Sequence, residues 1–186
     1  MLEHGSVILR PVKESDIADY EAWFTTDVEW QNWDGPWEVW TEDNVKEFIE
    51  IRRFATTFTP EIYDKLEIEV DGRHIGWVSR YVMVCNDFDG KTAVGLNLPP
   101  GDVRGRGIGH VALVLWLTYL FDKLDKDILY TQTWSGNFPM IALAKKIGFS
   151  EVRRIKDLRE VHGQKYDALT FSISKDEFAK LSNQRS

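Results

Sequence analysis

A glycine-rich turn at residues 103–110 constrains this chain more than any other segment. It reads Val-Arg-Gly-Arg-Gly-Ile-Gly-His and lies between a strand-like run, Thr92 to Leu98, and a long apolar stretch that begins near Gly109. Glycines let successive backbone N–H groups turn toward one point, and a following helix adds partial positive charge at its N-terminus. The segment therefore predicts a loop that cradles a pyrophosphate, with an ordinary glycine-rich strand-to-helix turn as the alternative.

Two better-known phosphate motifs do not fit this loop. It lacks the Gly-Lys-Ser/Thr ending of a nucleoside triphosphate loop, and no complete Gly-x-Gly-x-x-Gly opens an early β-α-β unit.

The spacing of apolar residues predicts four helices and a series of short strands. Helices are expected around Ile17 to Phe24, from 41 to about 56, from 109 to about 124, and from 138 to 147, where Gly148 supplies a left-handed cap. Expected strands lie near residues 6–10, 66–70, 75–82, 92–98, 128–133, 152–158 and 166–174.

Three local features refine these expectations. Asp71-Gly72 predicts a tight hairpin, and Gly95 inside its strand indicates a bulge or the close approach of another backbone. The segment from Thr25 to Trp40 is irregular, and we expect a loop with a partial turn of helix there.

Length and charge narrow the class of protein. A chain of 186 residues fits one domain, and its net charge of −7 opposes binding to nucleic acid or to anionic lipid. Cys85, the single cysteine, cannot form an internal disulfide, and no signal sequence or apolar run of about 20 residues is present. We therefore expect a cytoplasmic protein with no membrane span.

At the glycine-rich turn the sequence resembles the GCN5-related N-acetyltransferases (GNAT). Their Arg/Gln-x-x-Gly-x-Gly/Ala signature matches Arg104 to Gly109, and a second block of the family, a strand, an asparagine, a helix and Gly-Phe, matches Thr133 to Phe149. The resemblance covers nearly the whole chain, and an opening Leu-Arg-Pro is similar to that of the branch that acetylates ribosomal-protein N-termini, the RimJ/RimL-like branch.

The resemblance implies a fold and a co-substrate. The fold is an α/β (α+β) single GNAT-like domain over residues 1–186, with a central mixed, mostly antiparallel, splayed sheet flanked by helices. The co-substrate is acetyl-CoA, and no metal is implied. Its pyrophosphate would bind mainly the backbone amides of Arg104, Gly105, Arg106, Gly107, Ile108 and Gly109. Its pantetheine arm would lie beside Leu96, Asn97 and Leu98, and Asn137 would contact the arm, cap the next helix, or do both.

The proton donor expected from the family is missing. Many members place a tyrosine in the helix after the asparagine and some relatives place a serine near its start, but here Ala144 and Met140 occupy these positions. Neither side chain can donate a proton. Ser135, Tyr130 and water remain as substitutes, and a backbone N–H, that of Leu96 or Leu98, would polarise the thioester carbonyl.

The acceptor site is expected in the segment from Asp27 to Glu38. Between Glu14 and Glu50 every charged side chain except Lys46 is acidic, and tryptophans alternate with carboxylates that include Asp34 and Glu38. Aromatic faces and carboxylates attract cations, so this segment suits an amine, although packing tryptophans and a solvated acidic surface explain the same pattern. The scattered histidines show no metal-ligand spacing, and we expect His74 and His110 to be structural.

We therefore predict an N-acetyltransferase that moves the acetyl group of acetyl-CoA to a primary amine by direct attack. The acceptor is a protein N-terminus or a small cationic amine such as a polyamine or an aminoglycoside. A non-catalytic acyl-CoA-binding or sensing module is the alternative of a different class. Exposed tryptophans would suit a homodimer.

Overall fold

The computed structural model describes residues 1–84 and 86–183, and Cys85 lies outside them. Its strands are β1 (Leu2–His4), β2 (Val7–Arg10), β3 (Lys65–Val70), β4 (Arg73–Val82), β5 (Thr92–Asn97), β6 (Ile128–Trp134), β7 (Ser150–Val161) and β8 (Gln164–Ser174). Its α-helices are α1 (Ile17–Thr25), α2 (Glu42–Ala55), α3 (Ile108–Lys123), α4 (Phe138–Ile147) and α5 (Lys175–Asn183). Short 3₁₀ turns are η1 (Glu14–Asp16), η2 (Val28–Asn32), η3 (Asn86–Phe88) and η4 (Gly101–Val103).

The strands form a mostly antiparallel open sheet in the order β1-β2-β3-β4-β5-β6-β8-β7. β2 pairs antiparallel with β3, placing Leu9 opposite Ile68, and β6 pairs antiparallel with β8, placing Thr131 opposite Phe171. β5 and β6 run parallel, with Ala93 opposite Tyr130. The expected fold class, a mixed sheet flanked by helices, is confirmed.

The described chain divides into two compact units. The first, here the N-terminal unit, comprises Met1–Val78 and Leu96–Leu115; the second, the C-terminal unit, comprises Ser79–Gly95 and Trp116–Ser186. A single domain spanning residues 1–186 stays a prediction.

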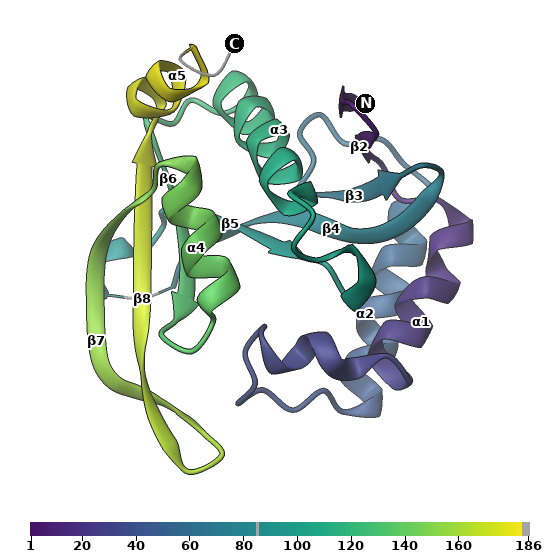
Figure 1. The fold of residues 1–186 in the computed structure, drawn as a ribbon. Helices are drawn as coiled ribbons and strands as arrows, with labels where there is room; N and C mark the ends of the chain where they lie inside the picture. Colours follow the sequence, from purple (N-terminus) through teal and green to yellow (C-terminus); the bar gives the residue numbers. More distant parts are fainter. Residues whose placement is uncertain (85, 184–186) are drawn as a thin grey trace. The chain divides into compact units, whose positions relative to one another are not determined.

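In the N-terminal unit, α1 and α2 lie side by side (Figure 1). The apolar stripe predicted for α1 is buried in full, and Tyr20 at its centre contacts Phe48 of α2 and Trp77 of β4 with ring centroids 5.5 and 5.2 Å apart. The side chain of Thr41 caps α2 by accepting a hydrogen bond from the Asn44 amide. Large aromatic side chains therefore make up much of this core.

In the C-terminal unit, the long β7–β8 hairpin curves beside β6, and α4 lies against that strand (Figure 1). Trp116, Leu117, Leu120 and Phe121 of α3 are buried here, and Phe121 packs against Phe178 of α5. This core is apolar, as the period of the α3 sequence predicts.

Several boundaries differ from the sequence-based expectation. β1 and α5 were not predicted. β1 has three residues and α5 has nine, which is too short for a clear pattern of apolar residues. Phe54, near the end of α2, is 67% exposed, because it does not share the helix face of the buried Val45, Ile49 and Arg52. No helix in the described residues is long and apolar enough to cross a membrane.

The close backbone approach also lies at a different glycine. A Cβ at Gly95 would come within 3.1 Å of the Ser79 hydroxyl, which is tight but adjustable, whereas a Cβ at Gly76 would overlap the carbonyl oxygen of Asn97. Gly76 has φ of 150°. It is therefore Gly76 that lets β4 pass directly beside the end of β5.

Candidate functional site

The predicted phosphate loop connects η4 to α3, within the N-terminal unit. Gly105 and Gly107 adopt φ of 75° and 83°, a left-handed conformation that only glycine enters readily. In the described part of the chain, no backbone N–H of residues 105–109 donates to a carbonyl, whereas the amides of His110 and Val111 both donate to the oxygen of Gly107. Five successive amides at the start of a 16-residue helix are thus available to an anion, which fits a pyrophosphate.

The side chain of Arg104 is engaged by groups of the protein and not left free for an anion. Its Nε and Nη2 donate to the carbonyl oxygens of Leu98 and Pro99 at 2.9 and 2.6 Å, and Nη2 also lies 2.7 Å from Glu29 Oε2. This ion pair lowers the pKa of Glu29. Arg104 therefore joins the end of β5 to η2, and the exposed Arg106 is the loop arginine that faces solvent.

The end of β5 brings Asn97 together with the acidic segment. Asn97 Nδ2 donates to Asp34 Oδ2 at 2.6 Å, and Leu96 and Leu98 on either side are half-buried. Protein around Asp34 raises its pKa by desolvation, opposed by the hydrogen bond from Asn97 and by the charge of Lys65, although the carboxyl retains solvent access. Asp34 is thus an oriented carboxyl group with an increased affinity for a proton.

Glu38 and the tryptophans of this segment have other surroundings. Glu38 is exposed and packs over Gly35 of its own turn. Trp30 is 3% exposed and lies against Phe24 with ring centroids 5.2 Å apart, and Trp40 lies 4.6 Å from Phe24. For Trp30 and Trp40 the packing alternative is therefore confirmed.

Lys65, at the start of β3, faces the same part of the N-terminal unit. Its Nζ lies 4.4 Å from the ring centroid of Phe48 and 5.0 Å from that of Trp77. Burial lowers the pKa of Lys65 to about 7, with the charge of Arg52 acting in the same direction and Glu67 and Asp34 opposing. A lysine that is partly deprotonated near neutral pH is unusual and favours a functional position.

A buried ionic network lies next to Lys65. Glu67 is fully buried, accepting from Arg52 Nη2 at 2.5 Å on one oxygen and from Tyr20 Oη at 2.6 Å on the other. His74 Nε2 lies 3.0 Å from that second oxygen, and its Nδ1 lies 2.9 Å from Asp19. Burial opposes the charge on Glu67, but these hydrogen bonds and charges keep its pKa below the ordinary value.

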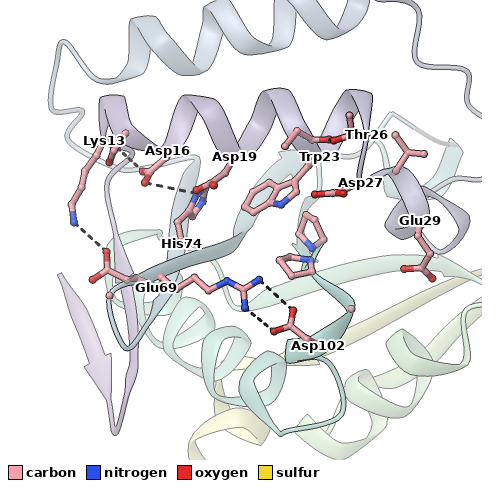
Figure 2. A pocket seen from close by; sticks show the side chains of 18 of the residues that line it. Lys13, Asp16, Asp19, Trp23, Thr26, Asp27, Glu29, Glu69, His74 and Asp102 are labelled. Atoms are coloured by element: carbon pink, nitrogen blue, oxygen red, sulfur yellow. Dashed lines mark hydrogen bonds and ion pairs between the residues drawn. The ribbon is translucent and has the colours of Figure 1, made fainter.

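A cavity of about 1050 Å³ opens on the other side of His74, between α1, the β3–β4 hairpin and η4 (Figure 2). Its charged residues pair with one another, Lys13 with Glu69 and Arg73 with Asp102. Asp16, Asp19 and His74 could each direct an atom toward a metal ion, but both Asp16 oxygens already accept from Arg10, at 2.6 and 2.9 Å. Asp27, Val28 and Glu29, at the start of the segment predicted for the acceptor, line this cavity, and none of the other site residues predicted from the sequence does.

The remaining predicted residues belong to the C-terminal unit. Asn137 caps α4, its side-chain oxygen accepting from the Met140 amide at 3.0 Å, and Ser135 Oγ accepts from the Asp167 amide at 2.9 Å. Ala144 is fully buried. The capping role of Asn137 is confirmed, and Ser135 holds the end of β6 to β8 while retaining a hydroxyl hydrogen.

Sequence reasoning missed Lys65, Glu67 and Gly76. The alternation of Leu66, Ile68 and Val70 identifies the apolar side of β3, and the same alternation places Lys65, Glu67 and Glu69 on the opposite side. A solvated surface is the usual meaning of such a pattern. Here helices cover that side of β3, so Glu67 is buried and Lys65 is half-buried.

Comparisons with known proteins agree with this geometry. Residues 6–150 match the sequence profile of the family described as an acetyltransferase (GNAT) domain. The SPbeta prophage-derived uncharacterized N-acetyltransferase YokL of Bacillus subtilis (strain 168) is 23% identical over 175 residues, which cover 93% of this chain and 92% of that protein.

Solved structures show the same fold. An acetyltransferase of the GNAT family from Bacillus anthracis superposes with a TM-score of 0.72 at 14% identity, covering 95% of this chain and 99% of that one. RimL, a ribosomal L7/L12 alpha-N-protein acetyltransferase in complex with coenzyme A, superposes with a TM-score of 0.71 at 16% identity, covering 94% and 97%.

Proposed function

Because the chain belongs to the GNAT family of acetyl-CoA-dependent acyltransferases, we propose that it acetylates a primary amine by direct attack, without an acyl-enzyme. The observation that carries this proposal is the run of free amides from Gly105 to Gly109 at the start of α3, which suits the pyrophosphate of acetyl-CoA. Acetyl-CoA supplies the thioester carbonyl when it binds. The backbone amides of residues 105–109 would hold it, with Leu96, Asn97, Leu98 and Asn137 as further contacts, while the amide of Arg104, predicted to join them, donates to the Gly101 carbonyl instead.

The amine has to lose a proton before it attacks, and Asp34 is our candidate for the base. Its carboxyl is held by Asn97 at the end of β5, and desolvation moves its pKa up, toward the range in which a carboxylate accepts a proton from an ammonium group. The amide of Leu96 is our candidate for stabilising negative charge on the carbonyl oxygen. Ser135 keeps a hydroxyl hydrogen and remains the side chain proposed for protonating the leaving thiolate.

The acceptor is a protein N-terminus or a small amine in this proposal. The RimL likeness favours the first, and the acidic segment from Asp27 to Glu38 favours the second. The single cysteine further supports a reducing, cytoplasmic setting, and a homodimer stays a proposal.

A non-catalytic acyl-CoA-binding module is the second candidate, favoured by Ala144 and Met140 at the positions of the usual proton donors. Thiol release from acetyl-CoA, followed across N-terminal peptides, polyamines, aminoglycosides and amino acids, separates the two. Calorimetry measures cofactor binding independently. Turnover of any amine supports the transferase, whereas tight binding without turnover supports the module.

Substitution of the two acidic candidates tests the assignment of the base. We expect Asp34→Asn to reduce kcat/KM at pH 7 by about 10² or more, the usual contribution of a general base. Glu38→Gln, which removes an exposed charge from the same loop, should change it by less than about threefold, since exposed charges interact weakly through water. Equal effects of the two substitutions would assign Asp34 to general electrostatics.

A further inference from the structure

Lys65 is half-buried, and the described residues place no hydrogen-bond acceptor at its amino group. Within the described part of the chain it makes no hydrogen bond and no ion pair, and its contacts are the faces of Phe48 and Trp77. An ammonium carries three donors. Cation–π contacts stabilise the charge but leave those donors unused.

The nearest buried carboxylate is already fully engaged. Glu67 uses one oxygen for Arg52 and the other for Tyr20 and His74. Arg52 also has a buried Nε with no acceptor in the described residues. Lys65 Nζ and Arg52 Nε are therefore two cationic donors that have no acceptor within hydrogen-bond distance among the described residues.

The charged groups that face Lys65 come from three elements. Arg52 of α2 disfavours its charge, while Glu67 of β3 and Asp34 of the segment after η2 favour it. Trp77 of β4 adds only an aromatic surface. A negative charge brought to Nζ would raise the pKa of Lys65 from about 7, so the ammonium form would be held at neutral pH.

We propose that Lys65 binds a carboxylate on the acceptor and that the acceptor is a small zwitterionic amine of the amino-acid type. This inference rests on the proposed function and names its substrate class. Asp34, held by Asn97, faces the ammonium end of such a molecule, and Lys65 faces its carboxylate end. A polyamine would instead place a second cation near Lys65 and Arg52, a like-charge contact that disfavours it.

Paired ligands test this inference directly. The twenty common L-amino acids and their α-carboxamides share side chain and amine and differ only in the carboxylate. Binding is followed by calorimetry and by quenching of tryptophan fluorescence. We expect at least one amino acid to bind about 10- to 100-fold more tightly than its amide, the range of one charge-assisted hydrogen bond.

Three variants locate the effect. Lys65→Met should remove the preference for the carboxylate, and Lys65→Arg should keep much of it. Lys126→Met, which removes an exposed lysine of the C-terminal unit, should leave both affinities unchanged. Binding at pH 7.5 should also take up protons, measured as a dependence of the heat on the ionisation enthalpy of the buffer.

The inference is overturned if amides bind as tightly as acids, if Lys65→Met retains the preference, or if no amino acid binds. Failure of the proposed function has a different signature. Acetyl-CoA would then not bind, or would bind with no turnover of any amine, while the Lys65-dependent preference for amino acids over amides would still be observed.

Discussion

The two compact units bury polar groups of different kinds. The buried polar residues of the N-terminal unit are all ionisable: Arg10, Asp16, Arg52, Glu67 and His74. In the described part of the C-terminal unit they are all threonines, namely Thr92, Thr131 and Thr170. The first unit therefore carries charge through its interior, and the second is an apolar scaffold with single hydroxyl groups.

The unit with the buried charges is also the one that contains most of the proposed site residues. Buried charges are costly to desolvate and add less net stability than well-packed apolar groups, so stability alone does not account for the network around Glu67. Here the network supports Lys65 and lies in the unit that contains Asp34, Asn97 and the phosphate loop. The C-terminal unit contributes α4 and the long hairpin, whose buried interior depends on apolar packing.

Removing one buried polar group from each unit should give the largest contrast. Glu67→Gln leaves Arg52 and His74 without their shared carboxylate, and we expect the free energy of unfolding to fall by about 3–5 kcal/mol. Thr131→Val removes one hydrogen bond, from Oγ1 to the Val94 carbonyl, and should cost about 1 kcal/mol. Urea denaturation measures both. Equal losses would mean that the two interiors do not differ energetically.

A matched pair of glycines sharpens the comparison for binding. Gly107 in the phosphate loop and Gly163 in the β7–β8 hairpin have φ of 83° and 77°, and a Cβ at either would meet no atom within 4 Å. Valine at either position should therefore cost a similar 1–2 kcal/mol, about the strain of a left-handed residue. Only Gly107→Val should weaken acetyl-CoA binding, by about 10²-fold or more, because it moves the free amides.

Calorimetry measures the affinity of each glycine variant for acetyl-CoA, and thermal unfolding measures the loss of stability that the valine causes. Retained acetyl-CoA affinity in a folded Gly107→Val variant would contradict the assignment of the phosphate loop.

A smaller effect is expected for the pH dependence of the free energy of unfolding, to which His74 of the N-terminal unit contributes. Burial lowers the pKa of His74, but hydrogen bonds and charges from Glu67, Asp16 and Asp19 outweigh it, so the pKa is raised. A raised folded pKa stabilises the protein fully below the unfolded value of about 6.5, and that contribution is lost as the pH rises through the folded value.

We therefore expect the stability difference between the wild type and His74→Gln to shrink as the pH rises above about 6.5. The comparison cancels the opposite contribution of Lys65, whose lowered pKa destabilises the protein below the unfolded lysine value. A constant difference for His74→Gln would remove it from the pH-sensitive groups.

Sequence patterns were sufficient for elements whose cause is local. Gly148 ends α4 in a left-handed conformation, and Asp71-Gly72 forms the predicted turn with φ of 51° and 79°. The phosphate loop is local in the same sense, since its glycines and the helix after it are contiguous. Its backbone conformation was therefore predictable, whereas the binding of a pyrophosphate by residues 104–109 stays a prediction, from which the engaged amide and side chain of Arg104 depart.

The contacts within the proposed acceptor site were not predictable, because they are long-range. Asp34 meets Asn97 across 63 positions, and Glu67 meets Tyr20 across 47. No spacing rule reports such contacts. Lys65 is the clearest case, since alternation along β3 gives it the appearance of a solvated residue, and its aromatic surroundings come from α2 and β4.

Two contacts connect the acidic segment from Asp27 to Glu38 with the chain between the end of β5 and the predicted phosphate loop. One is the ion pair between Arg104 and Glu29, whose carboxylate side chain is 61% exposed, and the other is the hydrogen bond between Asn97 and Asp34. Dissolved ions screen an exposed ion pair but hardly affect a hydrogen bond from an amide. We therefore expect added salt to weaken the attachment of the segment at Glu29 more than at Asp34, so that the carboxyl group proposed as the base stays beside Asn97 as the ionic strength rises.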